Sequence, residues 1–110
     1  MENIKYNAMM LVREITNILD EDMKHIAQGV LEVSYKTMSR DRKFEDSFEL
    51  DYVKDFCSGA TYNESTLIQY VLNAFRDAGY IAEYSRQNDS FKISVPQSVF
   101  VKAAKEQENK

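Results

Sequence analysis

The stretch from residue 63 to residue 95 constrains the fold of this chain most, because a helix pattern is followed there by two strand patterns. From residue 64 to 78, apolar side chains recur at intervals of three and four, which places them on one side of an α-helix. This apolar side comprises Leu67, Ile68, Val71, Leu72, Ala74, Phe75 and Ala78. Asn63 is a suitable N-cap and Gly79 a suitable end. We therefore expect an amphipathic helix that packs on a core.

A β-hairpin is expected directly after this helix. Residues 80–85 and 91–95 each alternate apolar and polar side chains, which is typical of half-buried strands. The polar residues 86–90 between them would form the turn. Pro96 would end the second strand. A last helix can follow it, with residues 106–110 as a frayed tail.

The amino-terminal part also has helical spacing, over about residues 4–19. Its apolar residues are Ile4, Ala8, Met9, Met10, Leu11, Val12, Ile15, Ile18 and Leu19. Because so many of them share one side, we expect this helix to be well buried.

Residues 20–43 allow two interpretations. As a second helix, this segment would place the acids at 20–22 at its positive end and the basic residues near Arg40 at its negative end. Alternatively, residues 30–37 alternate apolar and polar side chains after Gly29, which predicts a third strand. Charge placement favours the helix, but the sequence leaves both alternatives open.

Residues 44–48 look like a connector, and a short helix is expected after them, followed by a turn over residues 58–63. Phe48, Tyr52, Val53 and Phe56 would form the apolar face of that short helix. The chain of 110 residues fits one domain spanning 1–110, and its thirteen aromatic residues can supply a core. The fold class expected is α+β, mainly helical, with a C-terminal β-hairpin and a possible third strand at 30–37.

The sequence carries no recognisable catalytic, metal or cofactor site, so we do not expect an enzyme. His25 is the only histidine and has no evident partner for acid–base catalysis. Cys57 is the only cysteine, which fits a small buried side chain and is too few for a Cys/His zinc site. Acidic residues such as Asp51 and Asp55 are expected on solvated helix faces. There is no glycine-rich phosphate loop.

The expected location is the cytoplasm. A single cysteine cannot form an internal disulfide, which suits a reducing compartment. No apolar run approaches the roughly 20 residues that cross a bilayer, so no membrane partner is expected. The amino terminus also lacks the basic and apolar regions of a secretory signal.

The order short helix, turn, longer helix, glycine and hairpin over residues 49–95 resembles the winged helix-turn-helix superfamily. The segment from Leu67 through Gly79-Tyr80-Ile81 is similar to that superfamily's recognition helix and its exit into the wing. The resemblance implies DNA contacts in the major groove and from the wing. The residues implied are Thr66, Gln69, Asn73, Arg76, Arg86 and Lys92. The same order also resembles small bacteriophage proteins that end in a helix and a hairpin without binding DNA.

Charge argues against the DNA-binding interpretation. The net charge is −4, and residues 44–66 carry one basic against six acidic side chains, whereas basic residues supply most of the affinity for phosphate. We therefore expect a small acidic, non-catalytic protein-binding module, plausible for a phage or prokaryotic accessory or inhibitor protein in the host cytoplasm. The alternative is a winged-helix transcriptional regulator. A homodimer through the amino-terminal helices fits either function.

Overall fold

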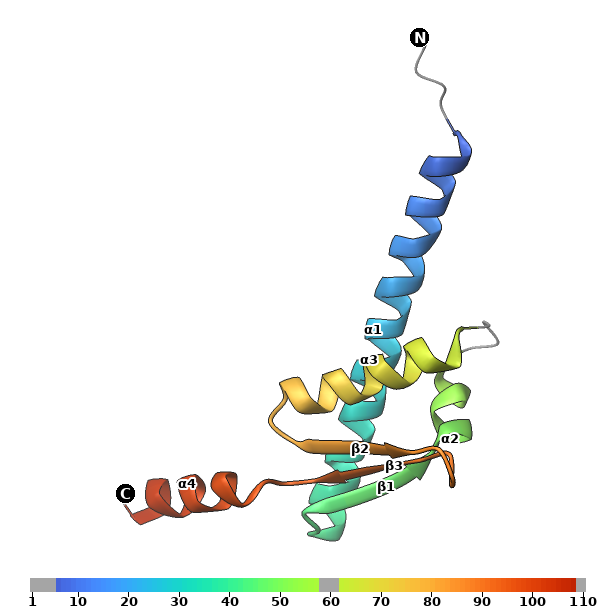
Figure 1. The fold of residues 1–110 in the computed structure, drawn as a ribbon. Helices are drawn as coiled ribbons and strands as arrows, with labels where there is room; N and C mark the ends of the chain where they lie inside the picture. Colours follow the sequence, from blue (N-terminus) through green and yellow to red (C-terminus); the bar gives the residue numbers. More distant parts are fainter. Residues whose placement is uncertain (1–5, 58–61, 109–110) are drawn as a thin grey trace.

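The computed structural model describes residues 6–57 and 62–108. Within those residues, four α-helices, one short 3-10 helix and three strands follow one another (Figure 1). They are α1 (Ala8–Asp41), β1 (Glu45–Glu49), α2 (Leu50–Lys54), η1 (Asp55–Cys57), α3 (Glu64–Asp77), β2 (Ile81–Ser85), β3 (Ser90–Ser94) and α4 (Gln97–Glu108). The expected α+β class is confirmed.

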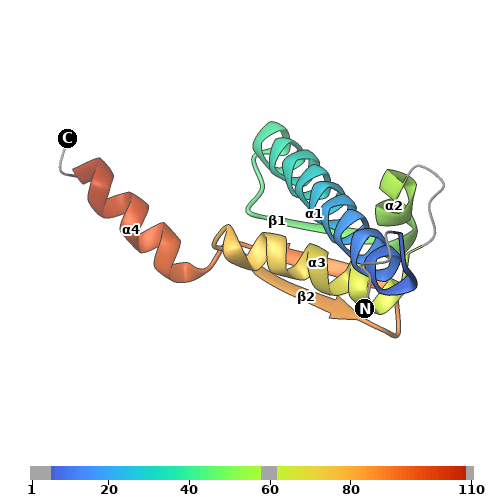
Figure 2. The ribbon, with the colours of Figure 1, turned by 90° about the horizontal axis from the view of Figure 1, so that it is seen from above.

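The three strands form an antiparallel sheet in the order β1–β3–β2. Its register places Phe91 of β3 between Phe48 of β1 and Tyr84 of β2. Helices α1 and α3 cover the same face of this sheet, as the two views in Figures 1 and 2 agree. The other face is open, and the side chains that alternate outward on it include Glu45 and Glu83. The molecule is therefore a two-layer structure around one core.

The core lies between the sheet, α3 and the second half of α1. Its largest fully buried side chains are Phe75, Phe91, Leu67, Ile93, Val30, Val53 and Val71. Phe48 joins the two layers, since its ring lies 5.1 Å from that of Phe91 and 5.9 Å from that of Phe75. Full burial of an aliphatic or aromatic side chain of this size contributes about 1.5–3 kcal/mol. These contacts fix how α3 and α1 sit on the sheet.

Helix α1 is continuous, so the alternative of a third strand at residues 30–37 is wrong. Asn7 caps its start, because the side-chain oxygen accepts a hydrogen bond from the Met10 N–H at 3.0 Å. The helix ends at Arg42, whose backbone has φ of 56°. The alternation of apolar and polar residues over 30–37 does not reflect a strand. The buried residues of this segment instead follow a four-residue helical interval through Val30, Ser34 and Met38.

The third strand lies instead in the stretch expected to be a connector. Residues 45–49 form β1, and Phe48 belongs to this strand rather than to the short helix. Backbone hydrogen bonds hold both ends of β1 to the hairpin. The Val95 N–H donates to the Phe44 carbonyl at 3.1 Å, and the Leu50 N–H donates to the Asp89 carbonyl at 2.8 Å.

The helix and hairpin predicted from residue 63 onward are confirmed. Asn63 caps α3 by accepting a hydrogen bond from the Thr66 N–H at 3.1 Å, and Gly79 leaves the helix with φ of 95°. The predicted strand bounds differ from β2 and β3 by one residue. Helix α4 continues to Glu108, through the first residues of the predicted tail. Residues 109–110 lie outside the described range, as do residues 58–61 of the predicted turn.

The first part of α1 projects from the body of the molecule (Figure 1). The described residues extend over 68 × 35 × 22 Å, with a radius of gyration of 18.4 Å, against about 13 Å for a compact domain of this length. Buried residues of α1 begin only at Met23. The helix begins at Ala8 rather than near residue 4, and the prediction that it is well buried is wrong for residues 8–19. Residues 4–5 of the predicted helix lie outside the described range. No described element of this chain packs against its apolar face.

Candidate protein-binding surface

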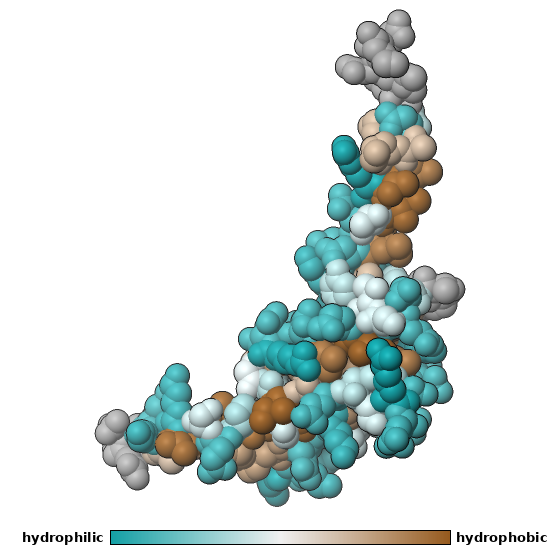
Figure 3. All heavy atoms as spheres, viewed as in Figure 1, coloured by the Kyte–Doolittle hydropathy of each residue, from teal (hydrophilic) through white to brown (hydrophobic). Residues whose placement is uncertain are grey.

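The projecting half of α1 (residues 8–22) carries a continuous apolar surface. At 100° per residue, six of its apolar side chains fall within an arc of about 120°. We call this set the apolar stripe: Ala8, Leu11, Val12, Ile15, Ile18 and Leu19. Its five larger side chains are between 37% and 60% exposed, and Figure 3 shows them as a brown band along one side of the projecting helix. Met9 and Met10 are exposed as well.

The apolar stripe does not continue the buried face of the rooted half (residues 23–41). The buried residues of the rooted half centre on a direction about 80° around the helix axis from the centre of the stripe. A straight helix therefore cannot press both surfaces against the same partner. The buried face of the rooted half packs against α3 and the sheet. The stripe points in a different direction from this face.

The direction of the stripe can be placed from two contacts lower on the helix. Asp22 and Gly29 lie on the same side of α1 as the stripe at 100° per residue. Asp22 accepts a hydrogen bond from the Tyr62 hydroxyl at 3.4 Å, and Gly29 lies against the Phe56 ring. The stripe thus faces the side of the molecule on which η1 and Tyr62 lie.

Polar residues bound the stripe at its base. Asp20, Glu21 and Asp22 follow Leu19 directly, and the Lys24 ammonium lies 3.2 Å from an Asp20 carboxylate oxygen. No helix in the described part of the chain has the length and apolar character needed to cross a bilayer. Together with the polar residues at its base, the stripe forms a short apolar surface on a helix whose other side chains are largely polar or charged.

No protein-family model matches this chain. No curated protein and no solved structure shows significant similarity to it. Function must accordingly be inferred from the surfaces of the chain itself.

The residues implied by the winged-helix resemblance are only partly brought together. Thr66, Gln69 and Asn73 lie exposed on the outer side of α3, and Gln69 Nε2 donates to Asn73 Oδ1 at 2.8 Å. The Arg76 guanidinium is turned to the backbone, because its Nη2 and Nε donate to the Ala82 carbonyl at 2.9 and 3.2 Å.

The other two implied residues lie away from α3. Arg86 is in the turn between β2 and β3, and Lys92 lies on the open face of the sheet, opposite the layer that contains α3. Acidic residues also stand at both ends of the α3 surface. Glu64 forms an ion pair with Lys54, which raises the pKa of Lys54, and Asp77 ends the helix. This surface therefore lacks a basic groove for phosphate.

His25 and Cys57 lie in different surroundings. His25 is exposed on α1. Cys57 is 6% exposed, its thiol lies 3.9 Å from the Val53 carbonyl, and burial raises the pKa of the thiol, which disfavours the reactive thiolate. Among the described residues, no three His, Cys, Asp or Glu side chains are grouped to hold a metal ion.

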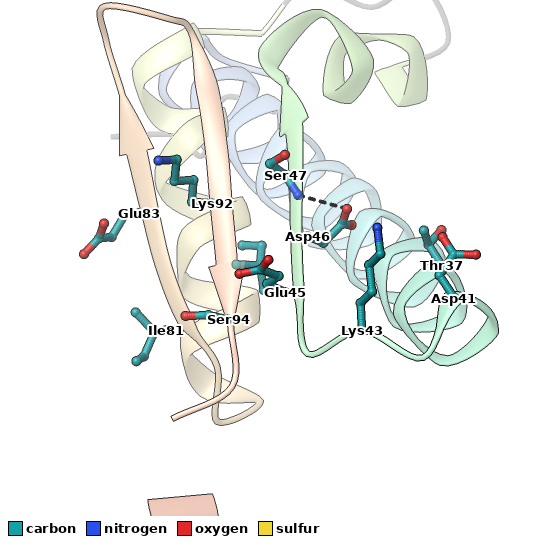
Figure 4. Close-up of a pocket in the computed structure, with 11 residues that line it drawn as sticks. Thr37, Asp41, Lys43, Glu45, Asp46, Ser47, Ile81, Glu83, Lys92 and Ser94 are labelled. Atoms are coloured by element: carbon teal, nitrogen blue, oxygen red, sulfur yellow. Dashed lines mark hydrogen bonds between the residues drawn. The ribbon is translucent and has the colours of Figure 1, made fainter. Parts of the chain in front are cut away.

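A hollow lies at the edge of the open sheet face, next to the end of α1 (Figure 4). It has a volume of about 580 Å³, and charged side chains such as Lys43, Glu45, Glu83 and Lys92 line it. In Figure 4 these side chains diverge rather than converge on one point, and the marked hydrogen bond runs from the Ser47 N–H to Asp46 Oδ1 at 2.9 Å. Binding sites for small molecules are predominantly apolar with a few convergent polar groups, unlike this hollow.

A smaller apolar hollow of about 320 Å³ lies near the start of α4. Tyr35, Met38, Phe44 and Tyr80 line it, and the Phe44 ring also meets the edge of Phe100 at 4.7 Å. Through this ring contact, α4 packs against the segment that precedes β1.

Sequence reasoning identified the residues of the apolar stripe but assigned them to the core. The signal that could have separated them is the change of direction between the two halves of α1. Residues 8–19 and residues 23–38 each have helical spacing, but their apolar arcs are offset. One uninterrupted helix with two offset arcs cannot bury both arcs against the same surface.

Proposed function

We propose that this chain is a non-catalytic protein-binding domain and that the apolar stripe is its binding surface. The observation that supports this proposal is the exposure of the whole stripe, between 37% and 60% for its five larger side chains. Soluble monomers rarely expose a contiguous apolar patch larger than a few hundred Å² unless it is an interaction site. Spacing of three and four residues along a helix is also the pattern by which helices dock on protein grooves or on other helices.

The stability of the projecting half supports the same proposal. Most helical stability in proteins comes from packing of an apolar face. The projecting half is 15 residues long and has no such packing within the described chain. A protein partner on the stripe would supply it.

The finer role that we propose is that of an accessory or inhibitor protein, as in the small bacteriophage proteins that the sequence resembles. Such a protein acts by occupying a partner and needs no catalytic residue. The net charge of −4 and a single buried cysteine are compatible with action in the cytoplasm of a host cell.

Site-specific photo-crosslinking in the producing cell tests the proposal. A photoreactive residue in place of Ile15 should form protein adducts, because it would lie inside the bound surface. The matched control replaces Gln69, which is also exposed but lies on α3. Absence of protein adducts at position 15, or adducts at position 69 alone, would contradict the stripe as the binding surface.

A winged-helix DNA-binding regulator is the second candidate. The observation that favours it is the order α2, turn, α3 and hairpin, with Thr66, Gln69 and Asn73 exposed on α3. Asparagine and glutamine can bond adenine edges in the major groove. This candidate predicts salt-dependent binding to duplex DNA that is lost on Gln69→Ala combined with Asn73→Ala. Absence of binding at low salt would exclude it.

A further inference from the structure

We infer that the apolar stripe binds a second copy of this chain, in an antiparallel pair of projecting α1 helices. This inference rests on the proposed function, because it names the partner of the same surface. The stripe spans residues 8–19, which is about 17 Å of helix, and its midpoint lies between residues 13 and 14. The same surface on two copies can pack together about a twofold axis, as in the interfaces of most dimers.

The residue order along the stripe matches an antiparallel pair. With the twofold axis at the midpoint, Ala8 faces Leu19 of the second copy and Val12 faces Ile15. A small side chain then opposes a large one at each end, and two branched side chains meet at the centre. Alternation of large and small side chains across facing positions is what allows helices to interlock.

Charge favours the antiparallel over the parallel orientation. Asp22 lies on the same side of α1 as the stripe, directly below it, where its carboxylate accepts the Tyr62 hydroxyl. In a parallel pair, both Asp22 carboxylates would stand at the same level. In the antiparallel pair they are about 25 Å apart along the axis, beyond the screening length of about 8–10 Å. Antiparallel helix dipoles add to this preference.

The position of the body favours the same orientation. The stripe faces the side of α1 on which η1 and Tyr62 lie. In the shared view of Figures 1 and 3, the brown band runs along the same side of the projecting helix as that on which α2 lies. A parallel partner would bring a second body against these elements. An antiparallel partner places the two bodies at opposite ends of the helix pair, where nothing in the described chain obstructs it.

The area of the stripe indicates a dimer that dissociates on dilution. Its exposed fractions correspond to roughly 500 Å² per chain, so that the pair would bury at most about 1,000 Å², the lower limit for a specific interface. We expect the mass in solution to rise from 12.8 kDa toward twice that value as the concentration increases.

Sedimentation equilibrium over a wide concentration range, with two variants, tests the interface. Ile15→Glu should remain at 12.8 kDa throughout, because it places a charge at the centre of the pair. Asn17→Glu introduces the same charge on the opposite side of the helix and should dimerise as the wild type does. An unchanged circular dichroism melt of Ile15→Glu at low concentration shows that its body is folded. Equal dimerisation of both variants would overturn the inference.

Cross-linking tests the orientation. In a Cys57→Ser background, chains with Ala8→Cys and chains with Leu19→Cys are mixed and treated with a short thiol cross-linker. We expect mixed 8–19 products and very few 19–19 products, since in the antiparallel pair the two residues at position 19 are about 16 Å apart along the axis. A majority of 19–19 products would overturn the antiparallel pairing.

The two proposals can fail separately. If the chain stays monomeric at every concentration but the photoreactive residue at position 15 captures a different protein, the second copy is excluded and the binding function stands. If the chain is monomeric and position 15 forms no protein adduct, both proposals are overturned.

Discussion

The two halves of α1 have similar apolar content but opposite surroundings. Six residues of the rooted half are buried, Met23, Ile26, Ala27, Val30, Ser34 and Met38, whereas the six residues of the apolar stripe are exposed. Both sets have helical spacing. The difference shows that an apolar arc in the sequence predicts a helix, but it does not predict whether the same chain buries that arc.

The largest expected difference between the halves is the response to a buried charge. Val30 is fully buried, so Val30→Asp places a carboxylate without a partner in the core and should cost more than about 4 kcal/mol. That is most of the stability of a small domain. The matched Ile15→Asp should change the free energy of unfolding of the monomer by less than about 0.5 kcal/mol. Thermal unfolding followed by circular dichroism measures both, and similar losses in both variants would show that the projecting half belongs to the core.

Amide hydrogen exchange should distinguish the halves in the unmodified protein. At low concentration, amides between residues 27 and 37 should exchange at least about 100-fold more slowly than those between residues 11 and 19, because only the former need a large opening. Mass spectrometry of peptic peptides resolves the two segments. Raising the concentration should slow exchange in residues 11–19 alone. Equal protection of both segments in dilute solution is the contrary outcome.

A smaller difference is expected at two hydroxyl side chains. Ser34 is 4% exposed and its hydroxyl donates to Asp46 Oδ2 at 2.6 Å, which links α1 to β1. Ser34→Ala leaves Asp46 Oδ2 without its donor, while Oδ1 keeps the Ser47 N–H, and should lower the free energy of unfolding by about 1–2 kcal/mol. Thr16→Ala, on the projecting half, should leave it unchanged or slightly raised, since alanine is the better helix former. Urea unfolding measures both, and a neutral Ser34→Ala would show that Asp46 finds another donor.

The smallest expected effect is a gain in stability. Gly29 lies inside α1, and an added Cβ would stand 3.5 Å from Phe56 Cδ2, an ordinary contact. Gly29→Ala should therefore raise the free energy of unfolding by about 0.5–1 kcal/mol, because glycine weakens a helix interior. A higher urea midpoint is the expected result. A lower midpoint would mean that Phe56 cannot accommodate the methyl group.

The stretch from Asn63 to β3 could be predicted from the sequence because several local signals agree there. Asn63 caps the helix, apolar side chains repeat every three or four residues, and Gly79 supplies the positive φ at the end. Each of these signals depends on neighbours in the sequence. Agreement between propensity, capping and pattern is what makes an element predictable.

Strand β1 could not be predicted in the same way. Its sequence, Glu-Asp-Ser-Phe-Glu, contains one apolar side chain, and it lies at the edge of the sheet. Phe48 alone gives no alternation that would indicate a strand. The strand forms because its backbone pairs with β3, which lies more than 40 residues later in the chain. Such a tertiary pairing overrides weak local preference.

The sequence predicted the residues of the candidate site but not their exposure. The residues of the apolar stripe and their helix were identified from spacing, but their burial was not, because spacing carries no information on which molecule provides the partner. Of the residues implied for DNA contact, Arg76 has its guanidinium on the Ala82 carbonyl, a contact that depends on the turn from α3 into β2.

The continuity of α1 has a consequence for how the molecule can change. Because no break separates the projecting half from the rooted half, the number of residues between them fixes the direction in which the stripe faces relative to the body. Inserting one residue between Leu19 and Met23 would rotate the stripe by about 100° around the helix axis. Inserting seven residues, which is close to two full turns, would return the stripe to within about 20° of its original direction. In a series of variants with one to seven inserted residues, the extent of any assembly through the stripe would thus vary with the period of the helix.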